Sequence, residues 1–258
     1  MPGSQCDGNR QSPINILTNH LEDGSDIGLT KLAMQNFDNP VDGTWKNNGS
    51  TLFFTPDSSA PVATTHTYLG EYKLLQFHFH WGADSQEGSE NRVNGNQYSG
   101  ELHFVHMRES SMSIYDGDRF TVVAVFIESD ENMELSGIWA KLSNIPDFNQ
   151  SLSVSNIVYN DLLPESLDYY YFNGSLTTPL CNETVQWVVL QSYISAPAEF
   201  FETLRTTPEK NGEELESNFR DVQNLNGRQV YQYQGAASHI LPAFSVLIIS
   251  AIAGLMHY

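Results

Sequence analysis

Two stretches of the chain alternate between two classes of residue with the period of a β-strand. In Gln76–Trp81 a glutamine and two histidines alternate with three aromatic residues, and in Glu101–His106 glutamate, histidine and valine alternate with leucine, phenylalanine and histidine. Because successive side chains of a strand point to opposite faces, one face of each stretch carries a set of polar residues. These polar residues are Gln76, His78, His80, Glu101 and His103.

The remaining patterns predict more strands and few helices. Phe120–Glu128 is continuously apolar, as a strand covered on both faces would be. A helix is expected over Met133–Leu142, and a second over Ser195–Arg205 with Ser195 as N-cap and Pro197 in its first turn. We predict a mainly β (α+β) single domain around a large, mostly antiparallel twisted central sheet with short peripheral helices. The other predicted strands are Thr51–Thr55, Lys73–Trp81, Glu101–Arg108 and Thr184–Tyr193.

Histidines that face the same way on two neighbouring strands are typical of a metal site. Three imidazoles match a catalytic zinc site, which has three protein ligands and an open position for water. Gln76 and Glu101 each stand two residues before a ligand on its own face, where they can accept the ligand's second N–H. His106 falls on the opposite face and is expected to be a structural core residue. The alternative is an aromatic-rich strand with polar positions. The predicted zinc ligands are His78, His80 and His103.

The composition is that of a globular protein with an unusual charge. The 258 residues are 40% hydrophobic, which supplies a sizeable core. The net charge of −19 argues against nucleic acid as a partner. No partner protein can be inferred.

The two cysteines and the chain ends bear on the compartment. Cys6 and Cys181 are either two free thiols or, in an oxidising compartment, one long-range disulfide.

The N-terminus has no signal-peptide pattern, whereas Ile240–Met256 is almost wholly apolar and follows the small residues 235–238. This tail predicts a glycosylphosphatidylinositol signal, a retained membrane span or a buried terminal helix. An anchor requires entry to the secretory route, so we expect that the true beginning of the protein precedes Met1. Glycosylation sequons start at Asn48, Asn149, Asn173 and Asn182.

Five motifs, which follow one another in the order that the family has, make the chain resemble an α-class carbonic anhydrase from residue 6 to about residue 231. In that family three histidines hold a zinc ion, and the water bound to the zinc loses a proton near neutral pH. The matching motifs are Asn9–Asn15, Gln76–Gly82, Gly88–Glu90, Glu101–His106 and Gly174–Pro179.

The resemblance implies reversible hydration of carbon dioxide to bicarbonate and a proton by zinc-bound hydroxide, with Zn²⁺ as cofactor. Thr177 is implied to accept the hydroxide proton and to donate its own proton to Glu90. Sulfonamides and small anions are the implied inhibitors. For the pocket residues the other interpretation is plain core packing. The residues implied to form the substrate pocket are Val105, Val122, Leu176, Trp187 and Thr178.

The resemblance also assigns supporting residues. Cys6 and Cys181 match the disulfide pair of secreted and membrane-anchored members, which would brace the loop that carries Thr177. Asn218 and Arg220 resemble a segment that supports the site from behind.

The chain departs from the family in three places. Ser50 stands where fast members have a proton-shuttling histidine, and a hydroxyl cannot titrate near neutral pH. Turnover is therefore expected to be slower than in the fastest members. Asn91 and Phe172 replace a histidine and a tyrosine that bond each other, which should affect stability rather than chemistry. The third departure concerns the family's N-terminal segment, which supplies aromatic packing and which we expect to precede Met1.

Together these features predict an α-carbonic-anhydrase-like catalytic domain over residues 1–234, followed by a small-residue site and hydrophobic tail over residues 235–258. The expected location is the extracellular face of the plasma membrane, through the C-terminal anchor, or the secreted fraction. The competing function is a catalytically silent carbonic-anhydrase-like extracellular binding domain. Such relatives typically lose a zinc histidine, whereas all three are present here.

Overall fold

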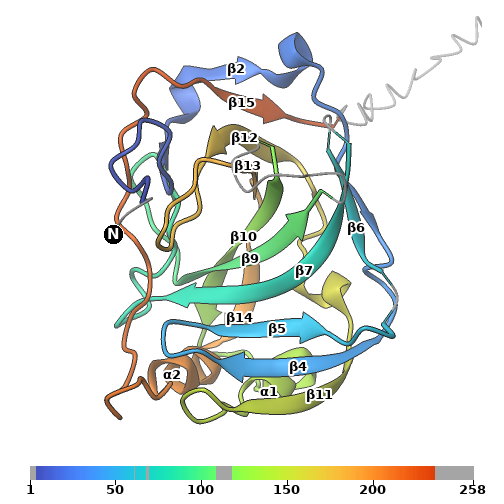
Figure 1. Ribbon diagram of the computed structural model, residues 1–258, viewed down its shortest axis with the longest axis vertical. Helices are drawn as coiled ribbons and strands as arrows, with labels where there is room; N and C mark the ends of the chain where they lie inside the picture. Colours follow the sequence, from blue (N-terminus) through green and yellow to red (C-terminus); the bar gives the residue numbers. More distant parts are fainter. Residues whose placement is uncertain (1–3, 61, 68–69, 109–117, 236–258) are drawn as a thin grey trace, which may run out of the picture.

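A single twisted sheet of 13 strands dominates the molecule (Figure 1). The computed structural model describes residues 4–60, 62–67, 70–108 and 118–235. The helices are α1 (Gly137–Leu142), α2 (Ala198–Arg205) and the short 3-10 helices η1 (Thr18–His20), η2 (Gly24–Ile27) and η3 (Tyr159–Leu162). The strands are β1 (Asn15–Ile16), β2 (Leu21–Asp23), β3 (Ala33–Gln35), β4 (Val41–Asn47), β5 (Leu52–Pro56), β6 (Thr64–Thr67), β7 (Gly70–Trp81), β8 (Arg92–Val93), β9 (Gly100–Met107), β10 (Phe120–Asp130), β11 (Ser151–Ile157), β12 (Tyr169–Gly174), β13 (Val185–Leu190), β14 (Ile194–Pro197) and β15 (Val230–Tyr233).

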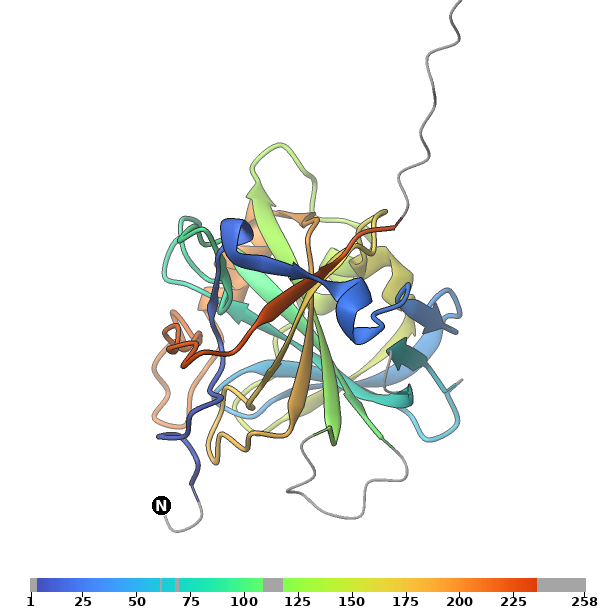
Figure 2. The same ribbon diagram turned by 90° about the horizontal axis from the view of Figure 1, so that it is seen from above.

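The order of the main sheet is β11-β4-β5-β7-β9-β10-β13-β12-β15-β2, so β7, β9 and β10 lie at its centre. Most neighbours are antiparallel, but β10 pairs in parallel with both β13 and β14, and β15 with β2. Viewed from above, the strands fan across one another with the twist typical of large sheets (Figure 2). The predicted fold class, a mostly antiparallel twisted sheet with short peripheral helices, is confirmed.

The central strands separate two hydrophobic cores. One face of β7 and β9 contributes Phe77, Phe79 and Phe104 to a large aromatic core that includes α1 and α2. The opposite face, through Val105 and its neighbours on β10 and β13, forms a smaller core that ends at the histidines. The side chains of both cores are almost fully buried. The strands that carry the histidines are therefore packed against a hydrophobic core on each face.

Both predicted helices begin later than expected. Ser195 is not an N-cap, because Ile194–Pro197 pairs with Ile127–Asp130 of β10 as strand β14, and α2 begins at Ala198 with Pro197 as its N-cap. The sheet hydrogen bonds prevail over the local capping pattern. Helix α1 begins at Gly137, because the preceding residues turn instead, with the amide of Asn132 donating to Asp130 Oδ1.

The predicted C-terminal tail cannot be described, since residues 236–258 lie outside the described residues. Within the described ranges, no helix has the length and apolarity needed to cross a membrane. The division of the chain at residue 234 stays a prediction.

Candidate metal centre

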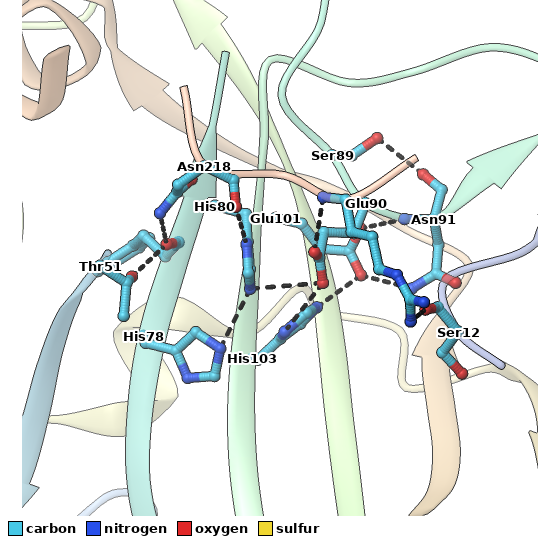
Figure 3. A network of polar contacts seen from close by, with 12 residues as sticks. Ser12, Thr51, His78, His80, Ser89, Glu90, Asn91, Glu101, His103 and Asn218 are labelled. Atoms are coloured by element: carbon cyan, nitrogen blue, oxygen red, sulfur yellow. Dashed lines mark hydrogen bonds and ion pairs between the residues drawn. The ribbon is translucent and has the colours of Figure 1, made fainter. Parts of the chain in front are cut away.

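The pairing of β7 with β9 brings three histidines together. The register sets His78 opposite His103 and His80 opposite Glu101, and all of these side chains rise from one face of the sheet. His78 Nε2 lies 3.1 Å from His80 Nε2, and one ring nitrogen of each histidine lies within 4.8 Å of the others. Figure 3 shows the three rings pointing toward one another. The three histidines are positioned to bind a metal ion.

Each imidazole is fixed through its other nitrogen. His78 Nδ1 bonds Gln76 Oε1 at 3.0 Å, and His103 Nε2 bonds Glu101 Oε1 at 2.9 Å. His80 Nδ1 bonds the backbone carbonyl of Asn218 at 3.1 Å (Figure 3). These bonds set the tautomers so that His78 Nε2, His80 Nε2 and His103 Nδ1 are the free ligand atoms. Such a donor set, three neutral nitrogens each backed by an acceptor, fits zinc.

The electrostatics of the site favour neutral imidazoles. Burial lowers the pKa of His78 and His103 well below the ordinary value, and the neighbouring imidazoles lower it further. Burial also lowers the pKa of His80, although the Asn218 carbonyl and the Glu101 charge oppose the shift. At neutral pH all three rings therefore have the uncharged form that a metal requires.

A buried carboxylate, Glu90, faces the histidines. Its Oε2 lies 3.5 Å from His80 Nε2 and 3.9 Å from His103 Nδ1, and this oxygen has no hydrogen-bond partner among the residues that the structure describes. Oε1 accepts the backbone N–H of Arg220 at 2.9 Å. Burial, and then the Glu101 charge, raise the pKa of Glu90 to about 8 in the metal-free protein, while the Arg220 N–H and the nearby Thr177 hydroxyl lower it. An unpaired acceptor beside three imidazoles is what a cation site would use.

Two cavities meet at the histidines. One, of about 270 Å³, is lined by His78, His103 and Thr177 together with an apolar wall. The other, of about 570 Å³, is lined by His78, His80, Glu90, Thr177 and Ser50, among other residues. All five residues predicted for the substrate pocket line the smaller cavity, and Phe53 adds an aromatic ring that the sequence interpretation missed. The five are Val105, Val122, Leu176, Trp187 and Thr178.

Comparison with known proteins agrees with this geometry. A family model described as eukaryotic-type carbonic anhydrase matches residues 2–234. The chain belongs to this carbonic anhydrase family. It is similar to carbonic anhydrase 1 of Mus musculus, with 34% identity over 238 residues, 87% of this chain and 90% of the relative. It is also similar to carbonic anhydrase 1 of Monodelphis domestica, with 32% identity over 87% of this chain and 89% of the relative. Carbonic anhydrase 15 of Mus musculus is 32% identical over 87% of this chain and 75% of that relative.

In this family member the loop behind Thr177 is bound to the N-terminal segment. Cys6 and Cys181 form a disulfide, as predicted from the resemblance. The amide of Gln5 donates to Leu180 O at 3.0 Å, and Gln11 Nε2 donates to Cys181 O at 3.2 Å. A covalent bond and two hydrogen bonds thus hold the loop that follows Thr177.

Two residues at the histidine cluster make contacts that the sequence did not indicate. Asn218 donates through Nδ2 to Phe79 O at 3.0 Å and accepts the amide of Trp81 at 2.8 Å, so it holds β7 as well as His80. Asn91 holds Glu101. Neither contact follows strand alternation, because both residues lie in irregular segments outside β7 and β9. His106 lies on the aromatic core face, where Nδ1 donates to Phe104 O at 2.9 Å.

Proposed function

We propose that the protein catalyses the reversible hydration of carbon dioxide to bicarbonate and a proton, with zinc as its cofactor. The observation that carries this proposal is the convergence of three neutral imidazole nitrogens, each backed by its own acceptor. His78, His80 and His103 would hold the ion. When bound, zinc acts as a Lewis acid that makes water a nucleophile near neutral pH.

In the proposed reaction the apolar wall contacts the substrate, and the polar residues orient the attacking oxygen. Val122, Leu176 and Trp187 offer a surface for a substrate that has no polar handle. With a cation bound nearby, the ionised form of Glu90 is favoured, so that it accepts the proton of the Thr177 hydroxyl. The Thr177 oxygen is then an acceptor only, which orients the attacking oxygen so that a lone pair faces the substrate carbon.

Proton transfer from the site to solvent is the slow step of the proposed reaction. Ser50 lines the larger cavity at the position where fast members have a histidine. Its hydroxyl cannot take up a proton near neutral pH. We therefore expect turnover to be limited by proton exit when buffer is scarce.

The proposed location is outside the cell. The Cys6–Cys181 disulfide supports an oxidising compartment. Among the sequons, Asn149 and Asn173 are exposed and suit a glycan, whereas Asn182 is buried. Asn48 borders both cavities, so a glycan there would crowd the site and we expect none. Anchoring through the C-terminal tail stays a prediction, which release from cells by a phosphatidylinositol-specific phospholipase would test.

Stopped-flow measurement of carbon dioxide hydration tests the proposed function. The zinc-loaded protein should accelerate hydration, and both a zinc chelator and a sulfonamide should abolish the acceleration. Protein that contains one zinc per chain and yet fails to accelerate hydration would contradict the enzyme proposal and favour a catalytically silent binding domain.

A further inference from the structure

Asn91 is bound to both oxygens of the Glu101 carboxylate. The Asn91 backbone N–H donates to Oε2 at 2.7 Å, and its Nδ2 donates to Oε1, also at 2.7 Å. Both residues are fully buried. Hydrogen bonds to a buried charge are stronger than those between neutral groups, so this pair of contacts is a firm one.

Asn91 is itself held from the opposite side. Its Oδ1 accepts the backbone N–H of Ile14 at 3.2 Å, and its carbonyl accepts the Ser89 hydroxyl at 2.8 Å. The next residue begins β8, which pairs with β1 of the N-terminal segment. Both amide atoms of Asn91 have partners, so the side chain has a single orientation that satisfies them all.

The consequence for the metal centre follows from where Glu101 points. Its Oε1 also bonds His103 Nε2 at 2.9 Å, as Figure 3 shows. With Asn91 on both oxygens, the carboxylate can rotate neither about its own axis nor away from the ring. The plane of the His103 imidazole, and with it the direction of Nδ1, is thereby fixed.

We propose that Asn91 is a positioning residue of the metal centre, which holds Glu101 so that His103 keeps its ligand atom aimed at the ion. The inference rests on the proposed zinc binding. In this chain a short amide thus replaces the histidine that the family has at the same place, and it links the centre to the N-terminal strand. Its effect should be on how long the ion is retained.

The first test compares zinc release from the zinc-loaded protein with that from Asn91→Asp. This substitution preserves shape but turns the amide donor into an acceptor that faces the Glu101 carboxylate. Release to a colorimetric chelator should be roughly 10- to 100-fold faster, the range found when residues behind metal ligands are changed. Asn94→Asp is the matched control: it makes the same chemical and charge change three residues away, on an exposed side chain that bonds Thr18. Its release rate should equal that of the wild type.

A second measurement follows the His103 N–H directly. In Asn91→Asp a carboxylate replaces the amide donor at Glu101 Oε1, the same oxygen that bonds His103 Nε2. The His103 Nε2–H proton signal of the zinc-loaded protein should therefore weaken or shift in Asn91→Asp and stay unchanged in Asn94→Asp. An unchanged signal in Asn91→Asp would contradict the positioning role.

The outcomes separate the two proposals. If the wild type retains no zinc, the proposed function fails. If the wild type retains zinc and Asn91→Asp releases it no faster than Asn94→Asp, the role of Asn91 is wrong. Should Asn91→Asp fail to fold, Asn91→Ser removes the side-chain bonds to Glu101 and Ile14 and keeps the backbone bond to Glu101. It should still release zinc faster than the wild type, and an unchanged rate would equally overturn the inference.

Discussion

The two faces of β7 and β9 both bury imidazoles, but only one face gathers them. His103 and His106 are three residues apart on β9, and each has one ring nitrogen bonded to the protein and the other unpaired by any described donor. On the site face, the free nitrogen of His103 lies near those of His78 and His80. On the core face, His106 lies among aromatic rings and stacks on Phe37. A metal site therefore depends on convergence, not on the number of buried histidines.

The same comparison separates function from stability. Site-face residues line the two cavities, where their polar atoms are available for chemistry. Core-face residues such as Phe77 and Phe104 fill space and line neither cavity at the metal centre. Changes on the two faces should thus fail in different ways.

The largest expected effect comes from removing a ligand on the site face. His103→Ala should lose zinc and lower carbon dioxide hydration by roughly 10⁴-fold or more, because enzyme accelerations of about 10⁶-fold and above would lose their main source. Zinc content and stopped-flow rates measure this. A variant that keeps both would show that the three histidines are not the metal site.

A substitution that creates a large cavity on the core face should lower stability and leave zinc binding unchanged. Phe104→Ala removes a fully buried ring and should lower the free energy of unfolding by about 3–5 kcal/mol. The folded fraction should still bind one zinc per chain. Denaturant unfolding and metal analysis on the same sample check the two statements, and zinc loss from folded protein would contradict the separation of the faces.

The buried His106 should make stability depend on pH. Burial lowers its pKa to about 4 in the folded protein, below the value of about 6.5 expected when unfolded. The unfolded state therefore takes up the proton first, so the contribution of His106 to the free energy of unfolding is constant above pH 6.5 and falls by about 3 kcal/mol as the pH drops toward 4.

His106→Gln isolates this effect, because the amide can still donate to Phe104 O but cannot titrate. In the metal-free protein, the ligand histidines and buried carboxylates contribute equally to both variants. The difference in unfolding free energy between pH 7 and pH 4 should therefore be smaller in His106→Gln. Parallel pH profiles would refute the assignment.

The sequence allowed the site face to be predicted further than its surroundings. Alternation placed His78, His80 and His103 on one face with Gln76 and Glu101 as their acceptors, because a strand has a fixed period of two. It could not predict that the third acceptor is the Asn218 carbonyl, since any residue can supply a backbone oxygen. Nor could it predict that Ile194–Pro197 pairs with β10, since the capping pattern of Ser195 is local and the strand partner is 67 residues away.

The smallest expected effect is a gain at the rim of the site face. Ser50 is exposed, its amide donates to Asn48 Oδ1 at 2.9 Å, and it lines the cavity that His78 and His80 share. An imidazole at this position would titrate near neutral pH and could carry the proton from the site to solvent. Ser50→His should raise turnover in weak buffer by roughly tenfold, less than a well-oriented proton donor gives, because the side chain is held only through its backbone.

The buffer dependence distinguishes proton exit from other causes of a higher rate. Added imidazole should accelerate the wild type more than Ser50→His, and the two rates should converge as buffer increases. In Ser50→Gln the new side chain is similar in size to histidine but has no titrating group, so its rate in weak buffer should equal that of the wild type. An equal gain in Ser50→Gln would mean that the site mouth, rather than the missing proton carrier, limits the rate. No gain in Ser50→His would mean that another group already carries the proton out of the larger cavity.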